Sequence, residues 1–106
     1  MNIIGNFTLD GETYSGTIQT LPFSGQVTLE PVTEKVSENT PDFRAFTARA
    51  RQHGRVQIGA AWKERSEAGN TYLAVRLDEP SFSAPIYCRL IQLEGQAGHS
   101  LIWSRS

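Results

Sequence analysis

The sequence predicts an all-β fold, a small barrel or sandwich of seven to eight mainly antiparallel strands that form a single domain over residues 1–106. Apolar and polar residues alternate with a period of two in short runs, and Gly, Pro, Asn or Asp interrupts these runs about every ten residues. No apolar pattern of period 3.6 persists for three turns. Because short strands leave edges that need a partner, we expect the sheet to close on itself or to stack in two layers.

The first half of the chain predicts four strands. The first three runs cover residues 3–9, 14–21 and 23–29. Asp10-Gly11 forms the first turn, and Pro31 ends the third run because proline has no N–H to donate to a ladder. Residues 33–41 are polar and predict a loop. Residues 42–49 predict a fourth strand, although their apolar residues fall on both faces, so one turn of helix is the alternative.

The clearest element is a hairpin formed by residues 55–65 and 71–78. Apolar residues occupy alternate positions of both runs, and a short turn containing Gly joins them. The positions that this alternation turns toward the core are Val56, Ile58, Ala60, Trp62, Leu73, Val75 and Leu77. Trp62 is therefore expected in the core, not at a binding surface.

The last part of the chain predicts a loop and two more strands. Pro80 and Pro85 bracket the loop, whose single apolar residue, Phe82, is expected to pack back against the domain. Residues 86–93 are apolar on both faces, which is typical of a strand covered on each side. A final apolar run occupies residues 101–103.

The composition fits a soluble domain with a packed core. Of the 106 residues, 39% are hydrophobic and 20% are charged, which argues against disorder. The only cysteine, Cys88, cannot form an internal disulfide and suits a reducing compartment. No stretch approaches the roughly 20 apolar residues of a membrane span, and residues 1–5 lack the charged region and apolar run expected of a secretion signal. We therefore expect a cytoplasmic protein that does not bind membranes.

The formal net charge of −1 conceals two segments of opposite sign. Residues 10–43 carry a net charge of −5, and residues 44–65 carry a net charge of +5. Arginine predominates among the cations, and its guanidinium suits phosphates and carboxylates. Two interpretations remain open: a basic patch that binds nucleic acid or an acidic protein surface, or neutralisation of one segment by the other across neighbouring strands.

The outer face of the hairpin is the candidate binding surface. By the same alternation it exposes small residues, among them Gly59, surrounded by the Tyr72 ring and by cations. A base could stack on Tyr72, or the small residues could make room for another packed segment. The residues expected to contact nucleic acid or another partner are Arg49, Arg51, Arg55, Lys63, Tyr72 and Arg76.

Signals for catalysis are few. Cys88 alternates with apolar residues and is expected to be a buried thiol, so a nucleophilic Cys88 acting with His99 is only a minor alternative. His53 and His99 have no His or Cys at a spacing typical of metal ligands. Phosphate-binding, dinucleotide-binding and serine-hydrolase motifs are absent. We therefore expect no enzyme activity, no cofactor and no metal.

Several short motifs occur in an order that resembles a known family. They are I-G-N-F-T at 4–8, P-D-F-R at 41–44, I-G-A-A-W-K at 58–63, Y-L-A-V-R-L-D-E-P-S-F at 72–82 and L-I-W-S-R at 101–105. Nearly the whole chain resembles the bacterial domain of unknown function 736 family. The resemblance implies small proteins of plasmids and integrative conjugative elements, and it carries over no catalytic or cofactor residue. The basic stretch 48–55 is longer than the turn expected there, so any binding by it would belong to this member.

Together these observations predict a non-catalytic binding module associated with mobile genetic elements. Its expected partner is nucleic acid, bound through an Arg-rich strand face. The alternative is a protein-interaction module without nucleic-acid binding, either an inhibitor or accessory protein or a homodimer.

Overall fold

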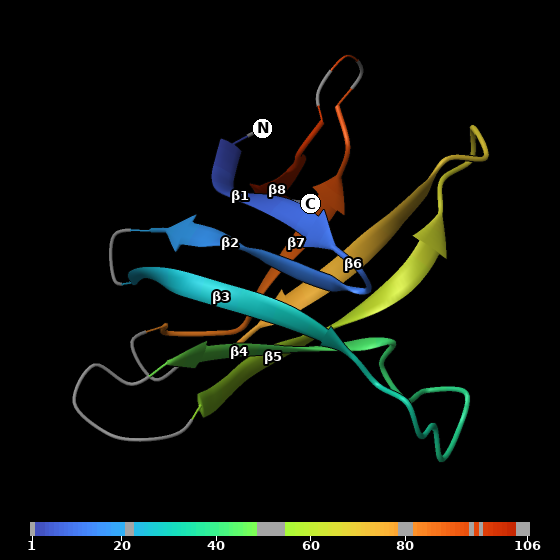
Figure 1. Cartoon of the computed structure of the whole chain (residues 1–106), viewed down its shortest axis with the longest axis horizontal. Helices are drawn as coiled ribbons and strands as arrows, with labels where there is room; N and C mark the ends of the chain where they lie inside the picture. Colours follow the sequence, from blue (N-terminus) through green and yellow to red (C-terminus); the bar gives the residue numbers. More distant parts are fainter. Residues whose placement is uncertain are drawn as a thin grey trace.

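Eight antiparallel strands close into a barrel in the computed structural model (Figure 1). The structure describes residues 2–20, 23–48, 55–78, 82–93, 95 and 97–103. The strands are β1 (Asn2–Asp10), β2 (Thr13–Gln19), β3 (Ser24–Pro31), β4 (Phe43–Ala48), β5 (Arg55–Arg65), β6 (Thr71–Leu77), β7 (Ile86–Ile91) and β8 (His99–Trp103). Each strand pairs with the next along the chain, and β8 pairs with β1. The all-β prediction is confirmed, as a closed barrel and not a sandwich.

The fourth predicted element is a strand, and the helical alternative is wrong. Phe43 and Ala45 are buried, while Arg44 between them is exposed, which is the period-two pattern of a sheet. β4 forms ladders with β3 on one side and β5 on the other. These ladders satisfy its backbone groups although its apolar pattern is irregular.

Inward-facing side chains from every strand fill the barrel. The buried core consists of Phe7, Ile18, Val27, Leu29, Phe43, Ala45, Ile58, Ala61, Leu73, Val75, Leu77, Cys88, Leu90 and Leu101. Phe82 packs against this core as expected, and its ring meets that of Phe23 edge-on with 6.3 Å between the ring centroids. The core thus follows the alternation of the sequence over most strands, with departures at a register shift between Ile3 and Gly5 of β1, in β5, and in β8, where three consecutive residues are buried.

A β-bulge in β5 reverses the alternation that the sequence suggests. Ala45 of β4 lies opposite Gly59, and Phe46 lies opposite Gln57, so Ile58 is an extra residue on β5. Beyond the bulge, Ala61 lies opposite the buried Val75 and is itself fully buried. The expectation that Ala60 and Trp62 face the core is therefore wrong.

β7 is covered on one side only, which corrects the expectation of cover on both. Cys88 and Leu90 are buried, but Tyr87 is 65% exposed and Arg89 is also exposed. The apolar character of the outward Tyr87 therefore has no explanation in the packing of this barrel.

Replacement of Gly59 by alanine tests the close approach of strands at the bulge. A Cβ at this position would lie far inside contact distance of the Arg76 carbonyl oxygen on β6. We expect Gly59→Ala to lower the free energy of unfolding by about 1–3 kcal/mol, as measured in urea, because backbone has to shift. Gly25→Ala is the matched control, since its Cβ would make an ordinary contact at 3.4 Å with the Phe23 ring. Equal stability of the two variants would contradict the described register.

Candidate functional site

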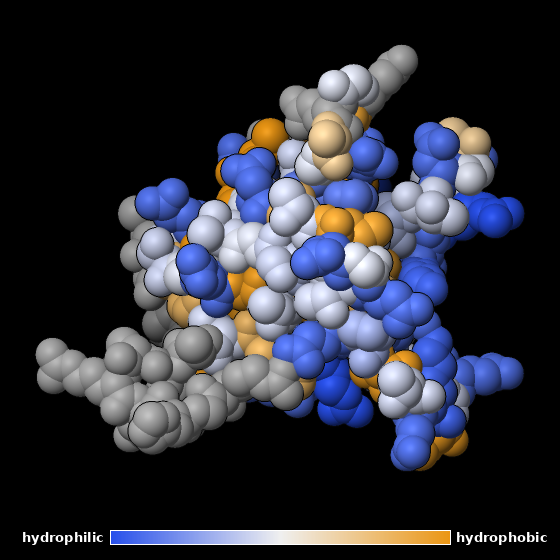
Figure 2. Space-filling view, viewed as in Figure 1, coloured by the Kyte–Doolittle hydropathy of each residue, from blue (hydrophilic) through white to orange (hydrophobic). Residues whose placement is uncertain are grey.

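Three aromatic rings and two arginines share the outer side of β5, β6 and β7. This surface, the aromatic face, consists of Trp62, Tyr72, Arg76, Tyr87 and Arg89, arranged around Ala74. The outward residues of β1–β3 differ in kind. They include Asn6, Thr8, Ser15, Thr17, Gln26 and Thr28. Figure 2 shows the side of the barrel on which β2 and β3 lie, where apolar residues are scattered among polar ones.

The strand register places these side chains on one surface. Ala74 lies opposite Trp62 on β5 and opposite Arg89 on β7. Two residues farther along β6, and so on the same side of the sheet, Arg76 lies opposite Tyr87. Because directly paired residues of neighbouring antiparallel strands point to the same side, all of these side chains face outward.

The rings and cations of the aromatic face are partly held by their neighbours. The Arg89 guanidinium carbon lies 5.1 Å from the centroid of the Tyr72 ring, within the range of a cation–π contact. Arg76 lies 3.8 Å from the Asp78 carboxylate, with about half of each side chain exposed. Such an exposed ion pair stabilises weakly, so the Arg76 guanidinium can exchange this partner for another anion at little cost.

A loop fixes the indole of Trp62. Its Nε1–H donates a hydrogen bond of 3.1 Å to the backbone carbonyl oxygen of Asn39, in the loop 32–42 between β3 and β4. This bond satisfies the polar edge of a half-buried ring whose remaining surface is apolar. The ring therefore has a defined position on the aromatic face.

An apolar hollow of about 210 Å³ lies at the centre of the aromatic face. Trp62, Ala74, Arg76 and Tyr87 contribute to its lining, together with the strand segments at Val75 and Cys88. It is smaller than the roughly 300–1,000 Å³ typical of pockets for whole cofactors or drug-sized ligands. The hollow thus suits one flat ring.

Of the six residues that the sequence predicted to contact a partner, two lie together on the aromatic face. Tyr72 and Arg76 lie on the aromatic face, as expected. Lys63 is exposed, but it lies opposite the buried Leu73. It therefore belongs to the row of β5 residues that faces the core farther along the barrel and not to the aromatic face. Arg49 and Arg51 lie outside the described residues, and Arg55 begins β5 without a described side chain.

Three residues of the aromatic face were not among the binding residues predicted from the sequence. Tyr87 and Arg89 alternate with Cys88 and Leu90, so the parity of β7 already pointed them outward. Trp62 was assigned to the core because a bulge cannot be recognised from alternation alone. Gly59, in contrast, serves strand pairing: its missing side chain admits the backbone of Arg76.

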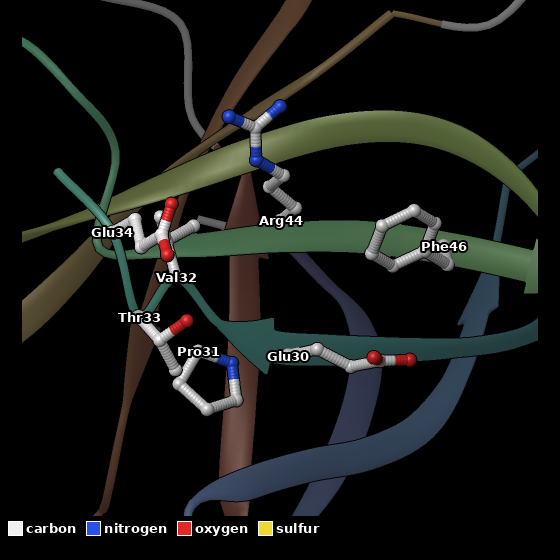
Figure 3. A pocket seen from close by; sticks show the side chains of 7 residues that line it. All are labelled: Glu30, Pro31, Val32, Thr33, Glu34, Arg44 and Phe46. Carbon is white, nitrogen blue, oxygen red and sulfur yellow. The ribbon is translucent and has the colours of Figure 1, made fainter. Parts of the chain in front are cut away.

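The acidic and basic segments meet in the fold. Glu30 of β3 and Arg44 of β4 are directly paired, and a hollow of about 290 Å³ beside them is also lined by Glu34 and Phe46. Figure 3 shows the Glu30 side chain extending along β3 toward Phe46, while the Arg44 guanidinium points away from it. Carboxylates and a guanidinium therefore share this surface, which is not a uniformly basic patch.

A second meeting point joins Asp42 to Lys63. The Asp42 carboxylate accepts a hydrogen bond from Lys35 and another, of 2.7 Å, from the backbone N–H of Lys63. These bonds lower the pKa of Asp42, whose side chain is 17% exposed. The two segments therefore lie beside each other at Arg44 and at Lys63, as the interpretation of neutralisation across neighbouring strands requires.

His99, the base suggested for Cys88, lies far from its thiol. Burial raises the pKa of the Cys88 thiol to about 12. Its partner on β8 is Trp103, whereas His99 lies four positions away, about 13 Å along the strand. Within the described ranges, no group of three or more His, Cys, Asp or Glu could hold a metal ion. The same residues include no helix long and apolar enough to cross a membrane.

Comparison with known families identifies the chain. A family model described as protein of unknown function (DUF736) matches residues 3–106, nearly the whole sequence. The chain belongs to this family. No match was found among curated proteins or among solved structures. The DUF736 description names no activity or ligand, so the aromatic face is the feature of this DUF736 protein from which a function is inferred.

The hydrogen bonds of Asp42 predict a pH dependence of stability. Because the pKa of Asp42 is lower in the folded than in the unfolded chain, its stabilisation is present above the unfolded value near 3.8. It is lost as the pH falls through the lowered folded value. Asp42→Asn should therefore be about 1 kcal/mol less stable than the parent at neutral pH, and the difference should vanish in acid. A difference in urea unfolding that stays constant down to about pH 2 would contradict this.

The buried thiol predicts slow alkylation. At about pH 8 a thiol with a pKa of about 12 contains very little thiolate, the reactive form. Iodoacetamide should modify native Cys88 at least about a hundredfold more slowly than the urea-unfolded chain. Equal rates would indicate an accessible, reactive thiol and would restore the nucleophile interpretation.

Proposed function

We propose that this protein binds single-stranded nucleic acid on the aromatic face. Bases would stack on Trp62, Tyr72 and Tyr87, and phosphates would pair with Arg76 and Arg89. The observation that carries this proposal is that the rings and guanidinium groups lie together on the outer side of three neighbouring strands. Sheets that combine stacking rings with cations are a common platform for unpaired bases.

The exposure of Tyr87 is the main support for stacking. Its ring is 65% exposed, although it lies next to the hollow at Ala74, where an apolar side chain could have covered it. An exposed ring beside an apolar hollow gains contact area when a base lies on it. Each stacked base contributes about 1–3 kcal/mol of binding free energy, and every base offers an aromatic face.

The two arginines supply the electrostatic part. Arg89 already lies over the Tyr72 ring, and a guanidinium in this position can remain stacked while its N–H groups bind a phosphate. Arg76 can exchange the exposed Asp78 carboxylate for a phosphate. Two phosphate contacts are few, so most of the affinity would come from stacking.

The geometry favours a single strand over a duplex. Bases in a duplex are stacked on one another, so their faces are not accessible to Trp62, Tyr72 or Tyr87. Duplex recognition instead inserts a helix or a two-stranded ribbon into a groove. The aromatic face is the outer side of three paired strands of a closed barrel, a shape that does not insert into a groove in this way.

Fluorescence anisotropy with a labelled oligothymidylate tests the proposal at about 50 mM salt. The parent protein should bind, and Tyr72→Ala or Tyr87→Ala should weaken binding by about 5- to 150-fold, which corresponds to one lost stacked base. Gln26→Ala, an exposed residue on the outer side of β3, is the control that should leave the affinity unchanged. A flat titration of the parent protein would overturn the proposal.

The salt dependence of the same titration identifies the cations. Two phosphate contacts predict a slope of about −1.4 in a plot of log affinity against log salt concentration. The five cations selected from the sequence would give about −3.5. The steeper slope would assign most of the electrostatic role to the basic segment 44–65, which contains four of these five cations.

A second candidate function is binding of another protein at the same face. Two observations favour it: Asp78 accompanies Arg76, and Glu64 lies opposite Tyr72, so both signs of charge occur there. Trp, Tyr and Arg are also the residues enriched at the centres of protein interfaces. An immobilised protein that captures one stoichiometric protein partner but no nucleic acid, with capture lost in Tyr87→Ala, would favour this candidate.

The setting in which the protein acts is a separate proposal. The family resemblance implies proteins of plasmids and integrative conjugative elements, and this association stays a prediction. Binding of single-stranded nucleic acid is compatible with such a setting and does not depend on it.

A further inference from the structure

We infer that the hollow over Ala74 is a subsite for one unpaired base, which lies between the Trp62 and Tyr87 rings. This inference rests on the proposed function and assigns its central contact. The lining of the hollow is almost entirely apolar, and its volume of about 210 Å³ fits a flat ring better than an extended ligand.

The floor of the subsite depends on a small side chain. Ala74 is the only side chain between Trp62 on β5 and Arg89 on β7 in its register row. A larger residue at position 74 would point outward into the hollow, because the inner row of β6 belongs to Leu73, Val75 and Leu77. Ala74 thus leaves space between the Trp62 and Tyr87 rings on the outer surface and leaves no cavity in the core.

Charge complementarity identifies the occupant as part of a nucleic acid. Arg76 belongs to the lining of the hollow, and Arg89 flanks its floor. A base within the hollow would leave its own phosphate near one guanidinium and the neighbouring phosphate near the other. An apolar peptide side chain would fill the hollow equally well but would supply no phosphate to either guanidinium.

The lining also determines the selectivity of the subsite. Its accessible surface is almost entirely apolar, and the Trp62 Nε1–H already donates to the Asn39 carbonyl oxygen, so the hollow offers few hydrogen bonds to base edges. Such a site binds the face of a base and not its hydrogen-bonding edge. We therefore expect similar affinities for oligonucleotides of different sequence and a strong loss when the base itself is missing.

Two changes test the subsite in parallel: a larger side chain at position 74 fills the hollow, and an abasic oligonucleotide lacks the base. Ala74→Leu should weaken binding of an oligothymidylate by at least about tenfold, whereas Ala74→Ser, which keeps the hollow, should change it less than about threefold. Thr17→Leu adds bulk to an exposed outer position on β2 and should bind like the parent. An abasic oligonucleotide of the same length should bind the parent at least about tenfold more weakly and should not distinguish Ala74→Leu from the parent.

The outcomes separate this inference from the proposed function. If the parent binds oligothymidylate and Ala74→Leu binds equally well, the subsite is wrong while the proposed function stands. If the parent binds the abasic strand as well as the natural one, base insertion is also overturned. If the parent binds no oligonucleotide, both proposals are overturned. Unchanged circular dichroism and thermal unfolding of Ala74→Leu would show that a loss of binding does not reflect misfolding.

Discussion

The extra residue in β5 is the constraint on which the barrel and its candidate site both depend. Because Ile58 has no partner of its own on β4, both Ile58 and Gly59 lie on the core side. Every later residue of β5 therefore faces the side opposite to the one that uninterrupted alternation would give it. This inversion buries Ala61 and brings Trp62 to the outside. Without the bulge, Lys63 would lie on the outer surface and the indole would compete for space in a filled core.

The charges show why position along the chain is a poor guide to position in space. A meander places consecutive strands side by side, so acidic β3 necessarily neighbours basic β4. Glu30 thereby lies beside Arg44, and the loop that carries Asp42 bonds to the backbone of Lys63. The cations of the aromatic face, Arg76 and Arg89, instead come from β6 and β7, which contain no acidic residue, and the pairing of these strands brings both to one outer surface.

Period-two alternation was sufficient to predict the fold class, because a half-buried strand imposes it on each run. It also placed Tyr72 and Arg76 on one outer surface. It failed at Trp62, since a bulge depends on how two strands fit and leaves no regular mark in either. For β7, apolar residues on both faces, Tyr87 among them, predicted cover on both sides. Tyr87 alternates with the buried Cys88, however, and this pattern predicts that its ring faces outward. Pairing between distant segments is therefore the information that the sequence analysis lacked.

Closure of the barrel has a consequence for how contacts with partners can change over evolution. With β8 joined to β1, the described strands leave no open edge to which a foreign strand could add. Recognition of a partner would then fall to the loops and to the outward side chains, which alternate with the core residues but do not pack among them. Such positions can be exchanged with little effect on folding, so related barrels can diverge in what they bind while keeping one interior.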